Sequence, residues 1–239
     1  MPHDIAPLTD AARAALIALD TPSVCNALEI VAPERRAKGF TARPLVAPFP
    51  QLKPVLAYAR TAIIRSKEPD GLPKDKAKSK RIAYYEYVEK GGPRPSVMVM
   101  QDVDGDDRGF GCFWGEVQSN VHKGLGCHGV ITDGTVRDID MMAPGFFVLA
   151  GGIVPSHAWV HAVDFGVQVN VAGMIVNSGD LIHADRHGAV VIPQGLERKV
   201  IEAAALIARR EAVLITASRQ AGFTVEALKR AIGEADDIH

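Results

Sequence analysis

Apolar residues near both ends of the chain recur at the three- and four-residue spacing of amphipathic helices. Residues 9–19 are rich in Ala and Leu, and Thr21 opens a second helix with a proline at its first helical position. Residues 196–218 present one apolar helical face, and Thr224 caps a shorter helix. The pattern predicts a helical arm over about residues 1–33 and two C-terminal helices.

The middle of the chain shows short apolar runs separated by Gly, Pro, Asn and Asp, which is the pattern of buried strands. Residues 55–64 form the longest of these runs, and residues 116–123 have the pattern of the end of a helix. Helices that flank such a sheet at both chain ends predict an α/β fold with one main domain. The other expected strands are residues 96–100, 129–132, 146–149, 167–171, 174–176, 181–183 and 189–192.

A lysine-rich polar insert over about residues 65–81 interrupts this pattern. Its lysines alternate with small or acidic residues, which indicates a solvated loop that leads into a helix carrying Tyr84, Tyr85 and Tyr87. The acidic residues close by argue against a phosphate or nucleic-acid role for the insert. Four aspartates between residues 102 and 107 lack the closing glutamate of an EF-hand, so we expect solvated turn residues there.

Composition narrows the class of protein. The 239 residues are 47% hydrophobic and carry a formal net charge of -1, which gives no electrostatic reason to expect nucleic acid or an anionic membrane as a partner. The three cysteines have neither the count nor the spacing of a disulfide framework or a zinc ribbon. The chain shows neither a signal-peptide pattern nor a long apolar run, so we expect a cytoplasmic protein.

The spacing of Gly124, Gly126 and Gly129 fits the dinucleotide signature G-x-G-x-x-G. That signature requires a strand before the glycines and a helix after them, and here the order is reversed. A glycine-rich loop still exposes backbone N–H groups that bind anions. We therefore expect Gly124, Leu125, Gly126 and Cys127 to hold the carboxylate of a small acid rather than a dinucleotide.

Arg137 and Asp138 stand side by side just after a short strand and an Asp-Gly turn. Arginine suits a planar carboxylate or keto acid, and an aspartate binds a hard cation directly or through water. The alternative interpretation is a surface ion pair near a turn. The residues alone leave both interpretations open.

Three features follow one another in the sequence: the glycine loop, a D-G-x-x-R-D motif from Asp133 to Asp138, and a G-D-x-x-x-A-D-x-x-G motif from Gly179 to Gly188. Over roughly residues 20–215 the chain resembles the 4-hydroxy-4-methyl-2-oxoglutarate aldolase family, which also contains the regulator of ribonuclease activity A. The resemblance implies an α/β/α sandwich like the phosphohistidine swivelling domain. It also implies homotrimers or hexamers with active sites between subunits, and class II pyruvate aldolase chemistry with Mg²⁺ or Mn²⁺.

The resemblance also implies roles for individual residues. Asp138 would be the carboxylate nearest the metal, Arg137 would contact the keto acid, and Glu116 would lie near the metal-bound waters. Glu211 would reach a neighbouring subunit's metal site. His161 lies where a basic residue often meets the distal end of the substrate, and His187 replaces a usual aspartate, so the resemblance does not identify the substrate.

Elementary chemistry supports a metal-dependent lyase. Cleavage of a C–C bond beside a pyruvyl unit leaves an enolate, which a divalent cation and Arg137 would stabilise, and oxaloacetate would lose CO2 through the same enolate. A Schiff-base route needs a desolvated lysine, and Lys123 is expected to be solvated. Two alternatives remain: a regulatory binding protein of the ribonuclease-regulator type, and a related lyase or hydrolase acting on another small acid.

Overall fold

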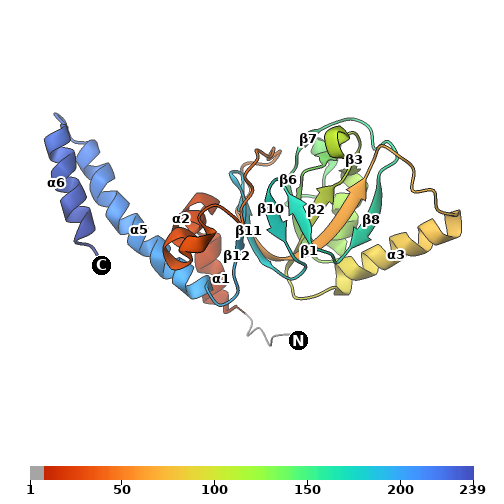
Figure 1. Cartoon of the computed structure of the whole chain (residues 1–239), viewed down its shortest axis with the longest axis horizontal. Coiled ribbons are helices and arrows are strands. Elements are labelled where there is room, and N and C mark those ends of the chain that lie inside the picture. Colours follow the sequence, from red (N-terminus) through yellow and green to blue (C-terminus); the bar gives the residue numbers. More distant parts are fainter. Residues whose placement is uncertain (1–7) are drawn as a thin grey trace.

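The computed structural model describes residues 8–239 and has an α/β fold, as predicted. The central sheet has the strand order β12-β11-β1-β2-β4-β6, and β8 pairs with the far end of β1 (Figure 1). The strands β1, β2, β4 and β6 are parallel, so their carboxyl ends lie at one edge of the sheet. Its strands are β1 (Val55–Arg65), β2 (Ser96–Asp102), β4 (Cys127–Thr132), β6 (Phe147–Leu149), β8 (His161–Phe165), β11 (Leu181–Asp185) and β12 (Gly188–Ile192).

Over residues 8–239, two small sheets and six helices complete the fold. A parallel three-stranded sheet has the order β3-β5-β7, and β9 and β10 form a hairpin. The small strands are β3 (Cys112–Trp114), β5 (Thr135–Val136), β7 (Gly152–Ile153), β9 (Val169–Val171) and β10 (Met174–Val176). The helices are α1 (Asp10–Ile17), α2 (Thr21–Val31), α3 (Lys74–Lys90), α4 (Glu116–Gly124), α5 (Glu197–Ser218) and α6 (Val225–Asp236), with short 3₁₀ turns η1 (Pro33–Arg35), η2 (Gly105–Asp107) and η3 (Ile139–Met141).

Successive β1 side chains enter different apolar clusters because strand side chains alternate between faces. Val55, Ala57 and Ala59 pack with the β9–β10 hairpin, whereas Ala62 and Ile64 pack with Trp114 and α3 side chains. The β9–β10 hairpin, and not a helix, therefore covers the face of the sheet that carries Val55, Ala57 and Ala59. The helices of the expected α/β/α sandwich lie on the other face and at the β12 edge, and the likeness to a phosphohistidine swivelling domain stays a prediction.

The terminal helices pack together at that β12 edge. Leu16 of α1, Val24 and Leu28 of α2 and Val200 of α5 form one buried cluster with residues of β1, β11 and β12. Asp20, and not the expected Thr21, is the N-cap of α2, because its Oδ1 accepts a hydrogen bond from the Ser23 amide at 2.8 Å. The first seven residues of the predicted arm lie outside the described part of the chain.

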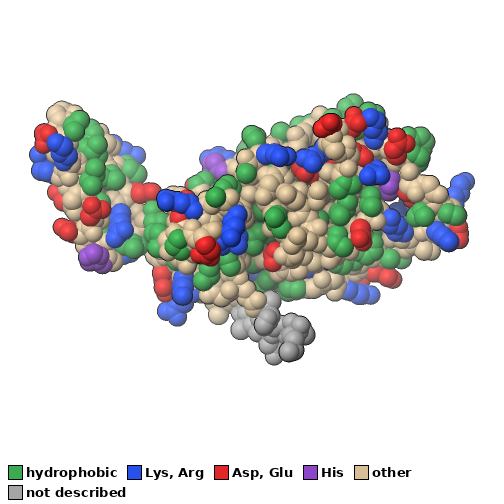
Figure 2. All heavy atoms as spheres, viewed as in Figure 1, with side chains coloured by type: hydrophobic (Ala, Val, Ile, Leu, Met, Phe, Trp, Pro, Cys, Tyr) green, Lys and Arg blue, Asp and Glu red, His purple; other side chains and the backbone are tan. Residues whose placement is uncertain are grey.

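The C-terminal helices α5 and α6 extend away from the sheet as a helical hairpin (Figure 1). Figure 2 shows hydrophobic side chains along this hairpin. Four large hydrophobic residues of α5, α6 and their connection are 37–67% exposed: Ile215, Phe223, Val225 and Ile232. The single chain therefore leaves an apolar surface on the hairpin.

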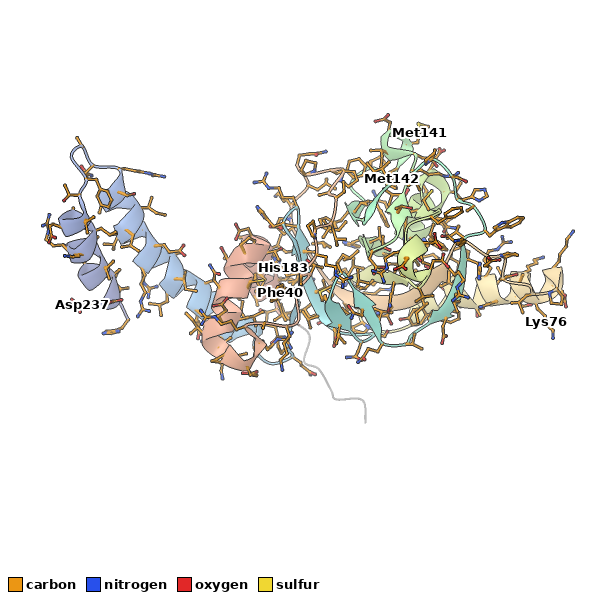
Figure 3. The ribbon with its side chains drawn as sticks, turned by 45° about the horizontal axis from the view of Figure 1, so that its top comes forward. Phe40, Lys76, Met141, Met142, His183 and Asp237 are labelled. Carbon is orange, nitrogen blue, oxygen red and sulfur yellow. The ribbon has the colours of Figure 1, made fainter. Side chains whose placement is uncertain are left out.

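Residues 74–81 of the lysine-rich insert are helical, which corrects the expectation of a loop there, whereas residues 66–73 lie outside any helix or strand. Helix α3 begins at Lys74, and Figure 3 shows Lys76 at its outer end, away from the sheet. Cations in the first turn oppose the helix macrodipole, and the Pro73 side chain at the N-cap accepts no hydrogen bond from the first helical amides. Burial of Tyr84 and Val88 in the core anchors the other end of α3.

Across residues 8–239, no single helix is long and apolar enough to span a bilayer. Only α1 and α2 taken together have the length and apolar composition of a membrane span, and they are bent at 113° to each other.

The close pairing of β4 and β6 depends on Gly129, which lies opposite Phe147. A Cβ at Gly129 would collide with the Phe147 carbonyl oxygen and lie 2.6 Å from its Cβ. We therefore expect Gly129→Ala to lower the free energy of unfolding by about 2 kcal/mol in urea titrations. Gly124→Ala is the matched control, because a Cβ there meets nothing within 4 Å, and a loss as large as that of Gly129→Ala would contradict the steric explanation.

Candidate active site

Two segments converge at the amino end of α4. Strand β3 runs into Gly115 and then α4, while the neighbouring strand β5 runs into Arg137 and Asp138. The Arg137 amide donates to the Trp114 carbonyl at 2.9 Å, which continues the β3–β5 pairing up to the site. The sheet therefore fixes the backbone on both sides of the predicted Arg137–Asp138 pair.

The side chains of this pair face the first turn of α4. Asp138 Oδ2 lies 3.4 Å from both Arg137 Nε and the Glu116 amide nitrogen. The Arg137 and Asp138 side chains are 35% and 40% exposed, so the pair is open to solvent and to a ligand. Glu116 is exposed at the first position of α4. The structure thus brings together the three residues predicted to be catalytic.

The absence of a side chain at Gly115 allows the Asp138 carboxylate to lie close to the first turn of α4. A Cβ on Gly115 would lie 2.5 Å from Asp138 Oδ2 and 3.2 Å from Arg137 Cγ. No other residue type leaves the Asp138 carboxylate this close to the helix. Gly115 was not among the predicted site residues, although it directly precedes Glu116 in the sequence.

Asp138 has a left-handed backbone with φ 51° and ψ 42°. This conformation is uncommon for residues other than Gly, Asn and Asp, and such backbones cluster at functional sites. The bend turns the chain into η3 directly after Asp138, which holds the carboxylate at the end of β5 instead of continuing the strand.

The first turn of α4 is suited to a negatively charged group, and the Asp138 carboxylate already accepts the Glu116 amide there. Gly115 offers no side-chain cap, and Ser119 is the first residue whose amide bonds back to Gly115. The earlier amides therefore have no partner within the helix, and they carry its positive dipole end. A carboxylate bound there would also meet the Arg137 guanidinium.

Two buried acids, Asp102 and Asp133, stabilise the loops at the same edge of the sheet. Asp133, in the turn before β5, accepts the Asp102 amide at 2.8 Å and pairs with Arg108 at 3.3 Å. Burial raises the pKa of both Asp102 and Asp133. Their hydrogen bonds fix the loop between β2 and β3, so these acids support the site without facing it.

The glycine loop lies at the opposite end of α4 from Arg137 and Asp138. Helix α4 has nine residues, which spans about 13 Å. The structure therefore does not bring Gly124, Leu125, Gly126 and Cys127 to this pair. The Cys127 side chain is buried, and burial raises the pKa of its thiol.

Two further predicted residues also lie elsewhere in the chain. His161 begins β8 and lines a separate depression beside α3, where its Nδ1 lies 2.8 Å from the Trp159 carbonyl oxygen. Glu211 is exposed on α5, in the projecting hairpin. Neither joins the Arg137–Asp138 pair within one chain.

The donor set suits a hard divalent cation that keeps most of its waters. Among residues 8–239, no group of three or more His, Cys, Asp or Glu side chains is arranged to hold a metal. Mg²⁺ typically takes one or two carboxylates and several waters as ligands. The accessible Asp138 and Glu116 can provide the carboxylates, and solvent can provide the waters. These two residues fit Mg²⁺ or Mn²⁺, and they do not fit a closed zinc site.

A family model described as Aldolase/RraA matches residues 21–191, a span that contains β1, α4, Arg137 and Asp138. This chain belongs to the RraA-like family. The D-G-x-x-R-D motif thus lies within the matched span of an RraA-like protein, at the edge of the sheet where β5 ends.

Two curated proteins align with part of this RraA-like chain. An uncharacterised protein of Methanocaldococcus jannaschii is 34% identical over 47% of this chain and 55% of its own length. A candidate 4-hydroxy-4-methyl-2-oxoglutarate aldolase of Halalkalibacterium halodurans is 29% identical over 46% of this chain and 52% of its own. The chain thus spans about half the length of the curated relatives it matches.

Solved structures share the fold. An uncharacterised protein of Pseudomonas syringae pv. tomato has a TM-score of 0.70 at 21% identity, covering 98% of both chains. Streptomyces coelicolor RraAS2, described as an unusual member of the RNase ES inhibitor RraA family, has a TM-score of 0.65 at 22% identity, covering 87% of this chain and 96% of its own. At these identities the likeness establishes the fold alone.

Proposed function

We propose that this RraA-like protein is a divalent-metal-dependent lyase that cleaves a C–C bond in a 4-hydroxy-2-oxo acid and releases pyruvate, and that it also decarboxylates oxaloacetate. The observation that carries the proposal is the Arg137–Asp138 pair at the open first turn of α4. Arg137 and the α4 amides suit the carboxylate of a 2-oxo acid, and the Asp138 carboxylate suits a cation.

The chain's own residues position the substrate. The amides of the first α4 turn other than that of Glu116 would hold the pyruvyl carboxylate, and Arg137 would donate from its planar guanidinium to the same group. Both are fixed before substrate arrives, because the β3–β5 pairing sets their backbone. Prepositioned donors stabilise developing negative charge without reorganisation.

Asp138 and Glu116 would hold Mg²⁺ or Mn²⁺ beside the keto oxygen. When bound, the cation stabilises the enolate charge that forms as the C–C bond breaks. The Glu116 carboxylate is the general base that we assign to accept the C4 hydroxyl proton, because Glu116 is exposed at the helix terminus next to Asp138.

We also propose that a second subunit completes the site in a homotrimer or hexamer. Val117 and Met141, which flank the site in sequence, are 68% and 59% exposed, and Figure 3 shows Met141 at the outer surface. A covering subunit would exclude water from the site and bring Glu211 of its projecting α5 near the metal. The formal net charge of -1 gives no electrostatic reason to expect a nucleic acid or an anionic membrane as partner.

The test is metal-dependent turnover by the purified protein. We expect pyruvate release from 4-hydroxy-2-oxo acids and from oxaloacetate to stop in EDTA and to return with added Mg²⁺. No turnover of any of these acids with Mg²⁺ or Mn²⁺ would overturn the lyase. It would instead favour the regulatory binding protein, or a lyase or hydrolase for another small acid.

A further inference from the structure

A cavity of about 550 Å³ lies at the amino ends of the parallel strands, away from the candidate active site. It is lined by the start of β1, by Gly126–His128 of the glycine loop and β4, and by α1. The carboxyl ends of the same strands lead toward Arg137 and Asp138, so the two places lie at opposite edges of the sheet.

The cavity gathers positive charge from three separate elements. Arg13 comes from α1, Lys53 from the segment before β1, and Lys123 from the last turn of α4. No acidic residue is among its described lining residues, and none of the three cations forms an ion pair with a carboxylate of residues 8–239. Unbalanced charge of this kind in a concave site attracts anions.

Backbone contacts hold two of the cations in place. Arg13 Nη1 donates to the Leu56 carbonyl at 3.0 Å, and Lys123 Nζ donates to the Pro144 carbonyl. These carbonyls orient the side chains but leave their net charge uncompensated. His128 shares the cavity, and burial followed by the charges of Arg13 and Lys123 lowers its pKa.

The rest of the wall is apolar. Ile17, Leu52, Val55, Leu56 and Phe147 line the cavity between the charged residues. A volume of this size accommodates a small organic molecule, and such sites usually combine apolar walls with a few polar groups. A free inorganic ion would leave these walls unused.

We propose that this basic cavity is a second ligand site, which binds a small organic anion through Arg13, Lys53 and Lys123 while its apolar body lies against Val55 and Phe147. The ligand class is a carboxylate or phosphate monoester with an aromatic or aliphatic body. The glycine loop would thus serve an anion at this site, distinct from the substrate of Arg137.

Binding of phenyl phosphate and benzoate to the full chain tests the proposal. Calorimetry and the NMR signals of His128 should show saturable binding of either probe at one site per chain. Lys53→Met and Lys123→Met should each weaken binding about tenfold, which is the scale of one charge-assisted hydrogen bond. Inorganic phosphate should bind at least about tenfold more weakly than phenyl phosphate, because it has no apolar body.

Matched variants make the test specific. Lys199→Met removes the same charge from an exposed position on α5, and Arg137→Met alters the proposed lyase site. Neither should change the affinity for phenyl phosphate. The proposal is overturned if His128 shows no saturable shift, if both cavity variants bind like wild type, if Lys199→Met weakens binding equally, or if Arg137→Met abolishes it. Equal affinity for inorganic phosphate would overturn the assigned role of the apolar wall.

Discussion

Replacing Arg137 with methionine is expected to lower kcat/KM for pyruvate release about 1000-fold. Methionine keeps an unbranched apolar stem but removes the positive charge and the planar donors. The substrate carboxylate would then meet only the α4 amides, and the enolate would lose its fixed cation. Arg137→Lys should be intermediate, at about a 100-fold loss, because a point charge cannot bind a carboxylate in two-pronged fashion.

The control for this experiment is Arg186→Met, which removes an exposed arginine at the β11–β12 turn. It should retain wild-type kcat/KM, and all three variants should unfold like wild type, because Arg137 is not part of the core. Near wild-type turnover by Arg137→Met would show that Arg137 and Asp138 are only a surface ion pair, the alternative that the sequence left open.

Local patterns were sufficient to predict most of the elements. Residues 174–176 were expected as a strand and form β10, and the run at 55–64 forms β1 with one more residue. These predictions worked because alternation and turn residues act over a few positions. The start of α3 could not be predicted in this way, because a lysine-rich first turn opposes the macrodipole and core contacts farther along anchor the helix.

The candidate site was predicted only in part. The residues themselves indicated Arg137 and Asp138, and the family resemblance implied Glu116; the structure brings all three together. The glycine loop was predicted to join them because its exposed backbone amides were expected to bind the substrate carboxylate. The direction of helix α4 explains the difference: its amide end lies at Gly115 and Glu116, where the Glu116 amide donates to Asp138, and its carbonyl end lies at the loop. The sequence predicts helix α4, but it does not show which end of the helix the segment with Arg137 and Asp138 contacts.

Helix α4 therefore links two different sites. Its amino end meets Arg137 and Asp138, its carboxyl end carries Lys123 into the basic cavity, and its buried face lies between them. His122 and Ser119 are its buried residues. The packing of His122 thus holds the helix that positions both sites, and its ionisation bears on their integrity.

His122 is fully buried and neutral. Its Nδ1 lies 2.7 Å from the Gln118 carbonyl oxygen, so Nδ1 must carry the proton and donate it. Its Nε2 then accepts from the Tyr84 hydroxyl, also at 2.7 Å, and the Trp114 ring packs against the imidazole at a 55° tilt with centroids 4.5 Å apart. A second ring proton would displace the Tyr84 donor and bury a charge. Burial accordingly lowers the pKa of His122 to about 4.

This pKa predicts an acid-dependent loss of stability. In the unfolded chain His122 takes up a proton near pH 6.5, whereas the folded protein resists it until about pH 4. The contribution of neutral His122 is complete above pH 6.5 and declines as the pH falls to about 4. Between these values the free energy of unfolding should drop by about 3 kcal/mol through this residue alone.

His122→Gln isolates the effect, because glutamine can donate to Gln118 and accept from Tyr84 without titrating. Urea unfolding at a series of pH values, at one protein concentration, should show that the variant lacks about 3 kcal/mol of the wild-type loss between about pH 6.5 and about pH 4. Burial also lowers the pKa of His183 and raises those of Asp102 and Asp133, which act in opposite directions on stability. Those groups are common to both proteins and cancel in the comparison. The exposed His157→Gln should keep the wild-type pH dependence, and if His122→Gln keeps it too, the acid sensitivity comes from other groups and His122 is not the buried base of α4.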